Sequence, residues 1–466
     1  MLKKRKTSAT NQALFNISST VILSGINFLT IPIFTRMLGA VNYGQYSIYH
    51  SWVVILTCIM GMEIQSTGGT ARYVFPDEYH GYLSSCLFLG SISSGVFILI
   101  GIIFRDYWAK LLGFSPAIVI LMLLCAFSHF VVGFAKSMFI YQKRAHRNFV
   151  ISVSLSIVTV LLSIFLIRLF PEQTRYVARI LGASIPYIMV AVVLWLYIFL
   201  KKPTLYNKKY WKYCLSMSLP MICHILANDV LKQSDKMMLQ YLGFAGATVG
   251  IYGFQCTYTG IVQILLTALN TSWCPFYYDD LNEQAYERLN KKCKNYLELF
   301  TVLACGFLLV SREVCYLFAN EEYWSGMGVV PILVLGIYFV FLYQFAVNFE
   351  FYNKKTKIIA TGTSCAAIGN IVLNLLLIPK FGMYGAAIAT ATAYGLLFIA
   401  HYNIASCLKE MKFHLTFVQF IPGLVCILLC IGIFYVLSEQ WYLRWIAGAA
   451  LGVVELMRIM KRKSIF

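Results

Sequence analysis

A cluster of charged and amide side chains interrupts one hydrophobic segment near the middle of the chain. Residues 214–242 otherwise read as a membrane-spanning helix, yet six of their polar residues form this cluster: His224, Asn228, Asp229, Lys232, Asp235 and Lys236. At about 100° per residue, all six fall within an arc of about 140°. A charge facing lipid costs several kcal/mol, so this arc is expected to face protein or a water-filled cavity.

The residue types in this arc suit two kinds of chemistry. Lys232 and Lys236 can neutralise an anion such as a phosphate or pyrophosphate, because lysine binds phosphate as a point charge. Asp229 and Asp235 are candidates for carrying a coupling ion, either H+ or Na+. The alternative is that these four residues pair with one another and only hold helices together.

Composition places this arc in a membrane protein. The chain has 466 residues, of which 59% are hydrophobic and only 12% charged, with a mean hydropathy of +0.72. A large soluble protein does not carry so much apolar surface. Apolar segments of about 20 residues, each able to cross about 30 Å of hydrocarbon, recur along the whole chain. The sequence therefore predicts an all-α polytopic membrane protein with about 14 transmembrane helices.

The distribution of positive charge predicts the orientation. With the N-terminus placed in the cytoplasm, 26 Lys and Arg residues fall at cytoplasmic ends, nine at the opposite ends and three at membrane depth. Cytoplasmic loops carry the excess of positive charge in bacterial membrane proteins. We therefore expect a multi-pass membrane protein with both termini cytoplasmic. The same bias explains the net charge of +19 without a nucleic-acid partner.

Two halves of the chain resemble each other. "TIPIFTRMLGAVNYGQYSIYHSW" from Thr30 parallels "KMMLQYLGFAGATVGIYGFQCTYTG" from Lys236, and "RILGASIPYIMVAVV" parallels "GMYGAAIATATAYGLLF", at an offset of about 205 residues. The pattern predicts two pseudo-repeated six-helix bundles, at 1–205 and 206–410, followed by a terminal helix pair at 411–466. Repeated halves are common in transporters, with the substrate site between them. The alternative is that short membrane turns simply favour Gly and Pro.

Further polar residues in the predicted spans are candidate site residues. His129 and Lys136 are seven residues apart and share a helix face, while Glu63 and Arg72 flank the small-residue stretch "GMEIQSTGGTARYV". Glu350 lies near the cytoplasmic end of its span. Glu63 and Glu350 join the ion-coupling candidates, and the others join the substrate-binding candidates. A satisfied helix contact for His129, and boundary positions for Glu350 and Arg72, are the alternatives.

The sequence contains no pattern that indicates an enzyme, a metal centre or a bound cofactor. There is no P-loop, G-x-S-x-G or H-E-x-x-H motif, and the 14 cysteines show neither C-x-x-C pairs nor zinc-ligand spacing. No loop is long enough to form a soluble domain, which argues against a membrane-embedded glycosyltransferase or polymerase. We therefore expect no catalytic residues and no metal ligands.

The order and spacing of several motifs resemble the polysaccharide flippases of the multidrug/oligosaccharidyl-lipid/polysaccharide exporter superfamily. They are "FTRMLGAVNYGQYSIYHSW", "SLPMICHILANDVLKQSDKMMLQYLG" with "VGIYGF", and "NIVLNLLLIPKFGMYGAAIATATAY". The chain departs from the pattern at "SDK", where an aspartate–arginine pair is common in the family.

The resemblance implies two bundles that move an undecaprenyl-diphosphate-linked oligosaccharide to the outer leaflet by alternating access, with the diphosphate in a cationic central cavity. It implies that Arg36, Arg72, Lys136 and Asp235 are cavity or gate residues. Lys232 and Lys236 are added to these cavity residues because they lie on the same polar face of the helix, not because of the resemblance. Expected partners are the lipid-linked oligosaccharide, the lipid bilayer and other membrane proteins of polysaccharide assembly. The main alternative is an ion-coupled drug or metabolite antiporter of the same superfamily.

Overall fold

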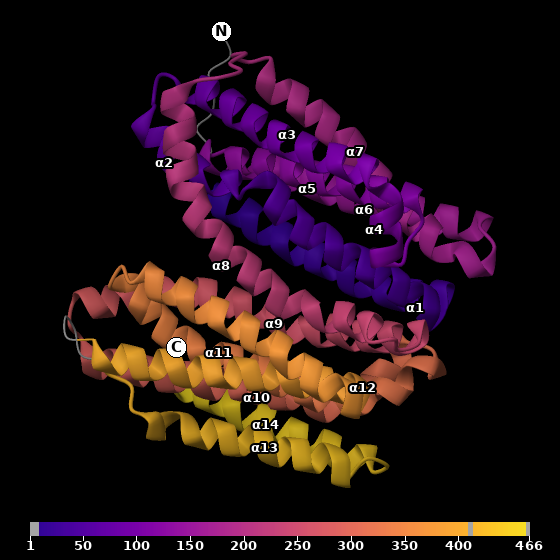
Figure 1. The fold of residues 1–466 in the computed structure, drawn as a ribbon. Coiled ribbons are helices and arrows are strands. Elements are labelled where there is room, and N and C mark those ends of the chain that lie inside the picture. The colour runs from indigo at the N-terminus through magenta and orange to yellow at the C-terminus, as the bar shows by residue number, and fades with distance from the viewer. Residues whose placement is uncertain (1–8, 409–412, 463–466) are drawn as a thin grey trace. The chain divides into compact units, whose positions relative to one another are not determined.

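The computed structural model describes residues 9–408 and 413–462, with the side chains of all but residues 9–21 and 27. The basic run KKRK at the N-terminus, Lys409 and Lys412 lie outside the described residues. Every regular element in the described part is a helix (Figure 1). Twelve of these helices are long and apolar enough to cross a membrane. The chain is thus an all-helical polytopic membrane protein, as its hydropathy predicts.

The first of two compact units comprises the residues up to Leu38 together with Gln45–Val230. Its helices, with the first part of α8 (Lys208–Tyr241), are α1 (Ala9–Gly61), η1 (Ile64–Thr67), α2 (Gly68–Val74), α3 (Tyr79–Ile103), α4 (Arg105–Leu112), α5 (Pro116–Tyr141), α6 (Ala145–Leu169), η2 (Glu172–Thr174) and α7 (Arg175–Phe199). Helices α5, α6 and α7 pack along one another, and α3 lies against α5 and α7.

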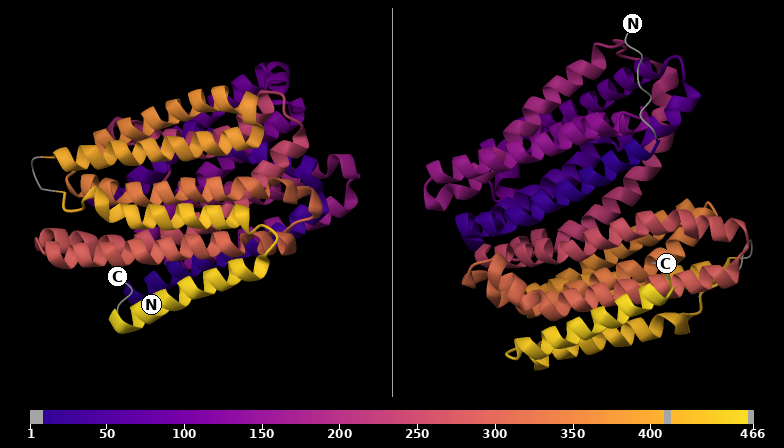
Figure 2. Two further views of the ribbon diagram at one scale, coloured as in Figure 1. Left: turned by 90° about the horizontal axis from the view of Figure 1, so that it is seen from below. Right: turned by 180° about the vertical axis from the view of Figure 1, so that it is seen from behind.

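The second unit comprises Gly39–Gly44 and Leu231–Phe466. After the end of α8 it contains α9 (Gly246–Asn282), α10 (Tyr286–Phe318), η3 (Glu321–Val329), α11 (Val330–Tyr352), α12 (Thr356–Cys407), η4 (Phe417–Phe420), α13 (Ile421–Val436) and α14 (Trp441–Arg462). Helices α13 and α14 run along α10, as the two views of Figure 2 also show. The chain therefore passes from the first unit to the second at residue 230/231, inside α8, whereas the sequence repeat places the division at 205/206.

The glycines of the repeated leucine–glycine turns share a positive φ. Gly39 and Gly243 each have a positive φ, of 67° and 85°, which a glycine adopts without strain. Helix α1 departs from helical geometry at Gly39, where two successive helical segments meet at a kink. Helix α12 likewise contains two spans that meet at Gly382, where φ is 55°.

The two repeated glycine segments also pack against each other inside the second unit. A Cβ atom added at Gly250 would lie 1.8 Å from the carbonyl oxygen of Ala40, and one at Gly44 would lie 2.5 Å from the carbonyl oxygen of Gly246. Backbones approach this closely only where glycine removes the side chain. The start of α9 is thereby held against residues 39–44 of α1.

Candidate functional site

A buried carboxylate lies at the meeting point of three helices in the second unit. Asp235 on α8 is only 4% exposed. Its Oδ2 accepts hydrogen bonds from the Tyr252 hydroxyl of α9 at 2.8 Å and from Thr390 Oγ1 of α12 at 2.6 Å. Its Oδ1 accepts from Asn374 Nδ2, also of α12, at 2.8 Å. Three uncharged donors therefore hold this carboxylate within a membrane-spanning bundle.

A second layer of amides and hydroxyls fixes these donors. Asn370 Nδ2 donates to Thr390 Oγ1 at 2.9 Å, while Asn370 Oδ1 accepts from Ser234 at 2.8 Å and from Asn374 at 3.1 Å. Asn370 and Asn374 are one helical turn apart, so both amides project from the same face of α12. The result is a preorganised network around Asp235.

One acceptor of this network has no partner within the structure. Asn374 Oδ1 is buried and makes no hydrogen bond, although its Nδ2 donates to Asp235. A buried carboxylate next to an unsatisfied amide oxygen and hydroxyl oxygens is the donor set that a hard cation prefers, and a carboxylate alone can also take up a proton. The cluster of Ser234, Asp235, Asn370, Asn374 and Thr390 is thus chemically suited to an exchangeable cation.

The lysines beside Asp235 do not complete this network. Lys236 is 9% exposed, and its Nζ donates to Gln233 Oε1 at 2.8 Å rather than to the carboxylate. Lys232 is exposed. Of the two lysines predicted from helix phase, only Lys236 is therefore buried with Asp235.

A second buried acid, Glu350 at the end of α11, pairs with His401 of α12. Both side chains have zero exposure, and His401 Nδ1 lies 2.9 Å and 2.8 Å from the two carboxylate oxygens of Glu350. His401 Nε2 is buried without a hydrogen-bond partner, and a Cβ atom at Gly362 would lie 2.6 Å from it. The lack of a side chain at Gly362 therefore gives the His401 ring its space beside Glu350.

The remaining acidic candidates lie in the first unit. Glu63 has a left-handed backbone conformation between α1 and η1, and both its carboxylate oxygens accept from Gln65 Nε2 at 3.1 Å. Asp229 is half-buried and lies close enough to Glu63 to interact with it electrostatically. The structure thus brings Glu63 near Asp229, while Asp235 has its own partners.

The basic candidates of the first unit lie in different surroundings. The His129 ring stacks on Tyr187 with centroids 3.9 Å apart and an interplanar angle of 2°. Lys136, two turns further along α5, is half-buried and within electrostatic reach of His129. Arg72 on α2 donates to the carbonyl oxygen of Tyr141 at the end of α5. Arg36 is exposed on α1, and His224 and Asn228 are half-buried on α8.

Several contributing residues were missed from the sequence. Tyr252, Asn370, Asn374 and Thr390 lie inside motifs from which only the internal repeat and the family resemblance were inferred. The signal that could have found them is the spacing in "NIVLN", which places two asparagines on one helix face in an otherwise apolar span. His401 gave no comparable signal, because its partner is 51 residues away.

Three cysteines that show no metal-ligand spacing in the sequence also come together. The sulfur atoms of Cys305 on α10 and of Cys426 and Cys430 on α13 all lie within 4.8 Å of one another. Three thiols at this spacing are a ligand set for a soft metal ion. They are also the small apolar residues expected at a close helix contact.

Comparisons with known proteins agree on a family and a fold. Residues 9–278 match the family described as polysaccharide biosynthesis protein. An uncharacterized membrane protein of Haemophilus influenzae is 23% identical over 379 residues, which are 78% of this chain and 90% of that protein. The structure of a lipid II flippase, MurJ in an inward closed conformation, is similar with a TM-score of 0.72 at 12% identity, covering 97% of this chain and 99% of that one. An inward-facing multidrug resistance MATE family transporter of the MOP superfamily gives a TM-score of 0.60 at 13% identity, covering 90% and 98%.

Proposed function

This chain belongs to the family of polysaccharide biosynthesis proteins, and from that membership we propose that it is a flippase for a lipid-linked oligosaccharide. It moves an undecaprenyl-diphosphate-linked oligosaccharide from the cytoplasmic to the outer leaflet of the bacterial inner membrane by alternating access. The lipid tail stays in hydrocarbon throughout, so the protein has to shelter only the sugar-diphosphate head. No covalent chemistry on the substrate is required.

The observation that carries this proposal is an uncompensated lysine inside a membrane span. Lys136 is half-buried on α5, about 7 Å along the helix from its end. Its neighbour His129 adds no negative charge, and no described carboxylate forms an ion pair with Lys136. A lysine within a span is costly unless an anion or water meets it. A diphosphate satisfies that requirement, whereas a cationic drug does not.

We assign the coupling ion to the Asp235 network. Three uncharged donors stabilise the carboxylate, but none of them neutralises it. An H+ or Na+ bound there would cancel the buried charge, and the unsatisfied Asn374 Oδ1 supplies a further oxygen ligand. Binding and release of that ion would then favour different conformations, because a buried uncompensated carboxylate is costly.

The experiment that tests the substrate uses the purified full chain in liposomes. Transfer of a fluorescent undecaprenyl-diphosphate oligosaccharide between leaflets is followed for wild type, Lys136→Gln and the matched control Lys380→Gln. Lys380 is an exposed lysine on α12 and should transfer normally. Wild-type transfer that falls at least tenfold in Lys136→Gln supports the proposal.

The same preparation distinguishes the alternative function. The Asp235 network would serve an ion-coupled drug or metabolite antiporter equally well. Ion-driven efflux of a small organic cation, with no transfer of the lipid-linked substrate, would therefore replace the flippase with the antiporter. Asp235→Asn is compared with wild type under a proton gradient and under a sodium gradient, and the gradient whose stimulation disappears in the variant identifies the ion.

A further inference from the structure

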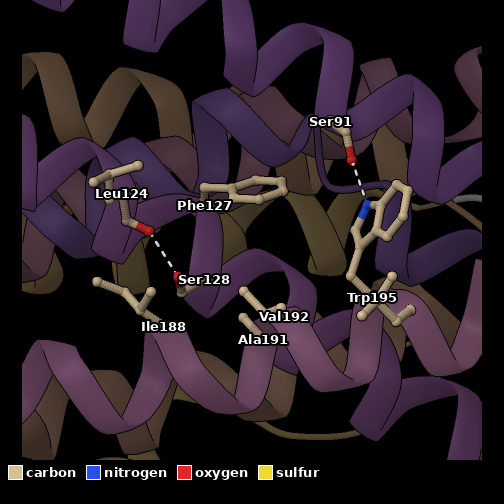
Figure 3. Close-up of a pocket in the computed structure, with 9 residues that line it drawn as sticks. Ser91, Leu124, Phe127, Ser128, Ile188, Ala191, Val192 and Trp195 are labelled. Carbon is tan, nitrogen blue, oxygen red and sulfur yellow. Dashed lines mark hydrogen bonds between the residues drawn. The ribbon is translucent and has the colours of Figure 1, made fainter.

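An apolar cavity of about 430 Å³ opens within the first unit between α3, α5 and α7 (Figure 3). It is lined by Ser91, Leu124, Phe127, Ser128, Ile188, Ala191, Val192, Trp195 and Leu196. Its volume lies within the range of known small-molecule sites, about 300–1,000 Å³. None of the residues singled out for transport lines it, so it is a separate feature of the protein.

The polar atoms in its wall are already satisfied. Trp195 Nε1 donates to Ser91 Oγ at 2.9 Å, and Ser91 in turn donates to the Leu87 carbonyl at 2.8 Å. Ser128 donates to the Leu124 carbonyl of its own helix at 2.7 Å, as Figure 3 shows. The cavity therefore offers only hydrocarbon and aromatic surface, which suits an alkyl chain rather than a polar ligand.

The mouth of the cavity lies on the lipid-exposed side of the bundle. Val192 is 56% exposed, and Leu196 and Leu124 are 45% and 38% exposed. On a helix that spans the bilayer, such side chains contact acyl chains. This open cavity forms a groove on the bundle. Apolar contact alone gives an acyl chain little preference for the groove over the bilayer, because lipid tails are as apolar as its walls. A resident chain must therefore be retained by its headgroup.

A basic cluster that can retain a headgroup lies at the end of α7. Arg147 Nη1 donates to the Tyr197 hydroxyl at 2.6 Å, and Lys201 Nζ lies 4.2 Å from the centre of the Tyr197 ring. Arg144 and Lys202 lie within electrostatic reach of His80 at the start of α3, as does Lys201.

The positive charge of this cluster is not balanced locally. No described carboxylate forms an ion pair with Arg144, Arg147, Lys201 or Lys202, and Glu78, in the adjacent loop, accepts a hydrogen bond from Tyr210. Leu196 lies three residues before the end of α7 at Phe199, which is about 4.5 Å at helical rise, and Lys201 and Lys202 follow in the adjoining turn. A lipid whose headgroup lies at the basic cluster can therefore place an acyl chain in the groove.

We propose that this surface binds an anionic phospholipid of the bilayer. The phosphate lies on Lys201, Lys202 and Arg147, and one acyl chain occupies the groove between α3, α5 and α7. Basic pockets at the end of membrane helices recognise anionic headgroups by charge, and arginine adds bidentate contacts to phosphate oxygens. This lipid site is separate from the transported substrate, and its test requires no transport.

Native mass spectrometry of the delipidated full chain tests the site. Phosphatidylglycerol and phosphatidylcholine with identical chains are titrated onto wild type, the double variant Lys201→Gln/Lys202→Gln and the control Lys354→Gln/Lys357→Gln. The control removes two exposed lysines, Lys354 between α11 and α12 and Lys357 in the first turn of α12. Each basic residue near an anionic lipid contributes about fivefold to binding, so the double variant should bind phosphatidylglycerol about 30-fold more weakly. The control should bind like wild type.

The groove and the identity of the lipid are tested separately. Val192→Phe fills the mouth of the groove at an exposed position, and should weaken phosphatidylglycerol binding while leaving all four cations in place. Equal binding of the two phospholipids by wild type, or unchanged binding in the lysine or the groove variant, overturns the proposal. A stronger preference for undecaprenyl phosphate than for phosphatidylglycerol also overturns it, because the groove would then belong to a polyprenyl substrate.

Discussion

The charge of Asp235 can be tested through the hydroxyl group of Tyr252. That hydroxyl is buried, and it donates to Asp235 Oδ2 at 2.8 Å. Tyr252→Phe removes this one hydrogen bond and leaves the donors Asn374 and Thr390 in place. The change therefore probes the carboxylate with little effect on packing.

The magnitude depends on whether the carboxylate is ionised. A hydrogen bond to a charged group contributes about 1.5–3 kcal/mol to stability, against about 0.5–1.5 kcal/mol for a neutral pair. For an ionised Asp235, we expect Tyr252→Phe to lower the free energy of unfolding by about 2 kcal/mol at pH 7.5. In an Asp235→Asn background the same change should cost about 1 kcal/mol.

Helix α9 supplies a matched control for this measurement. The Tyr258 hydroxyl is equally buried and donates to the backbone carbonyl oxygen of Ser311 at 2.7 Å, which is a neutral acceptor. Tyr258→Phe should cost about 1 kcal/mol in either background. The free energy of unfolding is measured in mixed micelles titrated with denaturing detergent and followed by tryptophan fluorescence.

The reasoning is refuted if Tyr252→Phe and Tyr258→Phe cost the same, and if the cost of Tyr252→Phe is unchanged by Asp235→Asn. Asp235 would then be neutral in the folded protein. In that case a proton occupies the carboxylate at pH 7.5, and a sodium-coupled role for Asp235 would be wrong.

Three further predictions concern stability. Burial lowers the pKa of His414, in the segment before η4, to about 4 from an unfolded value of about 6.5. Between pH 6.5 and 4 the unfolded chain binds a proton at His414 that the folded chain does not bind. The stabilisation from His414 is therefore complete above pH 6.5, and the free energy of unfolding falls by at most about 3 kcal/mol as the pH drops to 4. Unfolding measured at pH 7.5 and 5 should show no such loss for His414→Phe. Gly250→Ala should greatly reduce the folded yield measured by gel filtration, because its Cβ atom would lie 1.8 Å from a carbonyl oxygen of α1. The control Gly260→Ala, on the same helix, meets nothing within 4 Å and should stabilise the protein by about 0.5–1 kcal/mol. Arg444 is fully buried, pairs with Glu313 and donates to backbone carbonyls, so Arg444→Met should cost about 3–5 kcal/mol in detergent unfolding, and a loss below about 1 kcal/mol would contradict this account.

The helical architecture could be predicted from the sequence because a bilayer allows so few solutions. Every backbone polar group within hydrocarbon must be satisfied inside its own segment, so each long apolar run becomes a helix. The matching glycines of the leucine–glycine repeat, Gly39 and Gly243, both have a positive φ, a feature that the sequence did not predict. The short helices α2 and α4 were not predicted, because they are too short and too polar for hydropathy to detect.

Of the residues that form the site, the sequence predicted Asp235 but not its hydrogen-bond partners. Helix phase places Asp235 on a polar arc and predicts that it is shielded from lipid, and the structure shows it buried. Helix phase does not predict which helices provide the shielding. The partners Asn374 and Thr390 are 139 and 155 residues away, so their contacts depend on how α12 packs on α8. Lys232 shares the predicted arc yet is exposed, because an arc of 140° is wider than one helix contact.

The two buried carboxylates of the second unit differ in a way that separates their roles. Glu350 meets the ring of His401, whose Nδ1 lies 2.8 Å from a carboxylate oxygen. Asp235 meets only hydroxyl and amide donors, and Lys236 directs its ammonium group to Gln233 instead. Among the described residues, no hydrogen-bond donor to Asp235 carries a positive charge, so we propose that an ion from outside cancels its charge. Exchange of the proposed ion would change the energy of this buried site, whereas Glu350 and His401 join α11 to α12 without one. For this reason we place ion coupling at Asp235 and a structural role at Glu350.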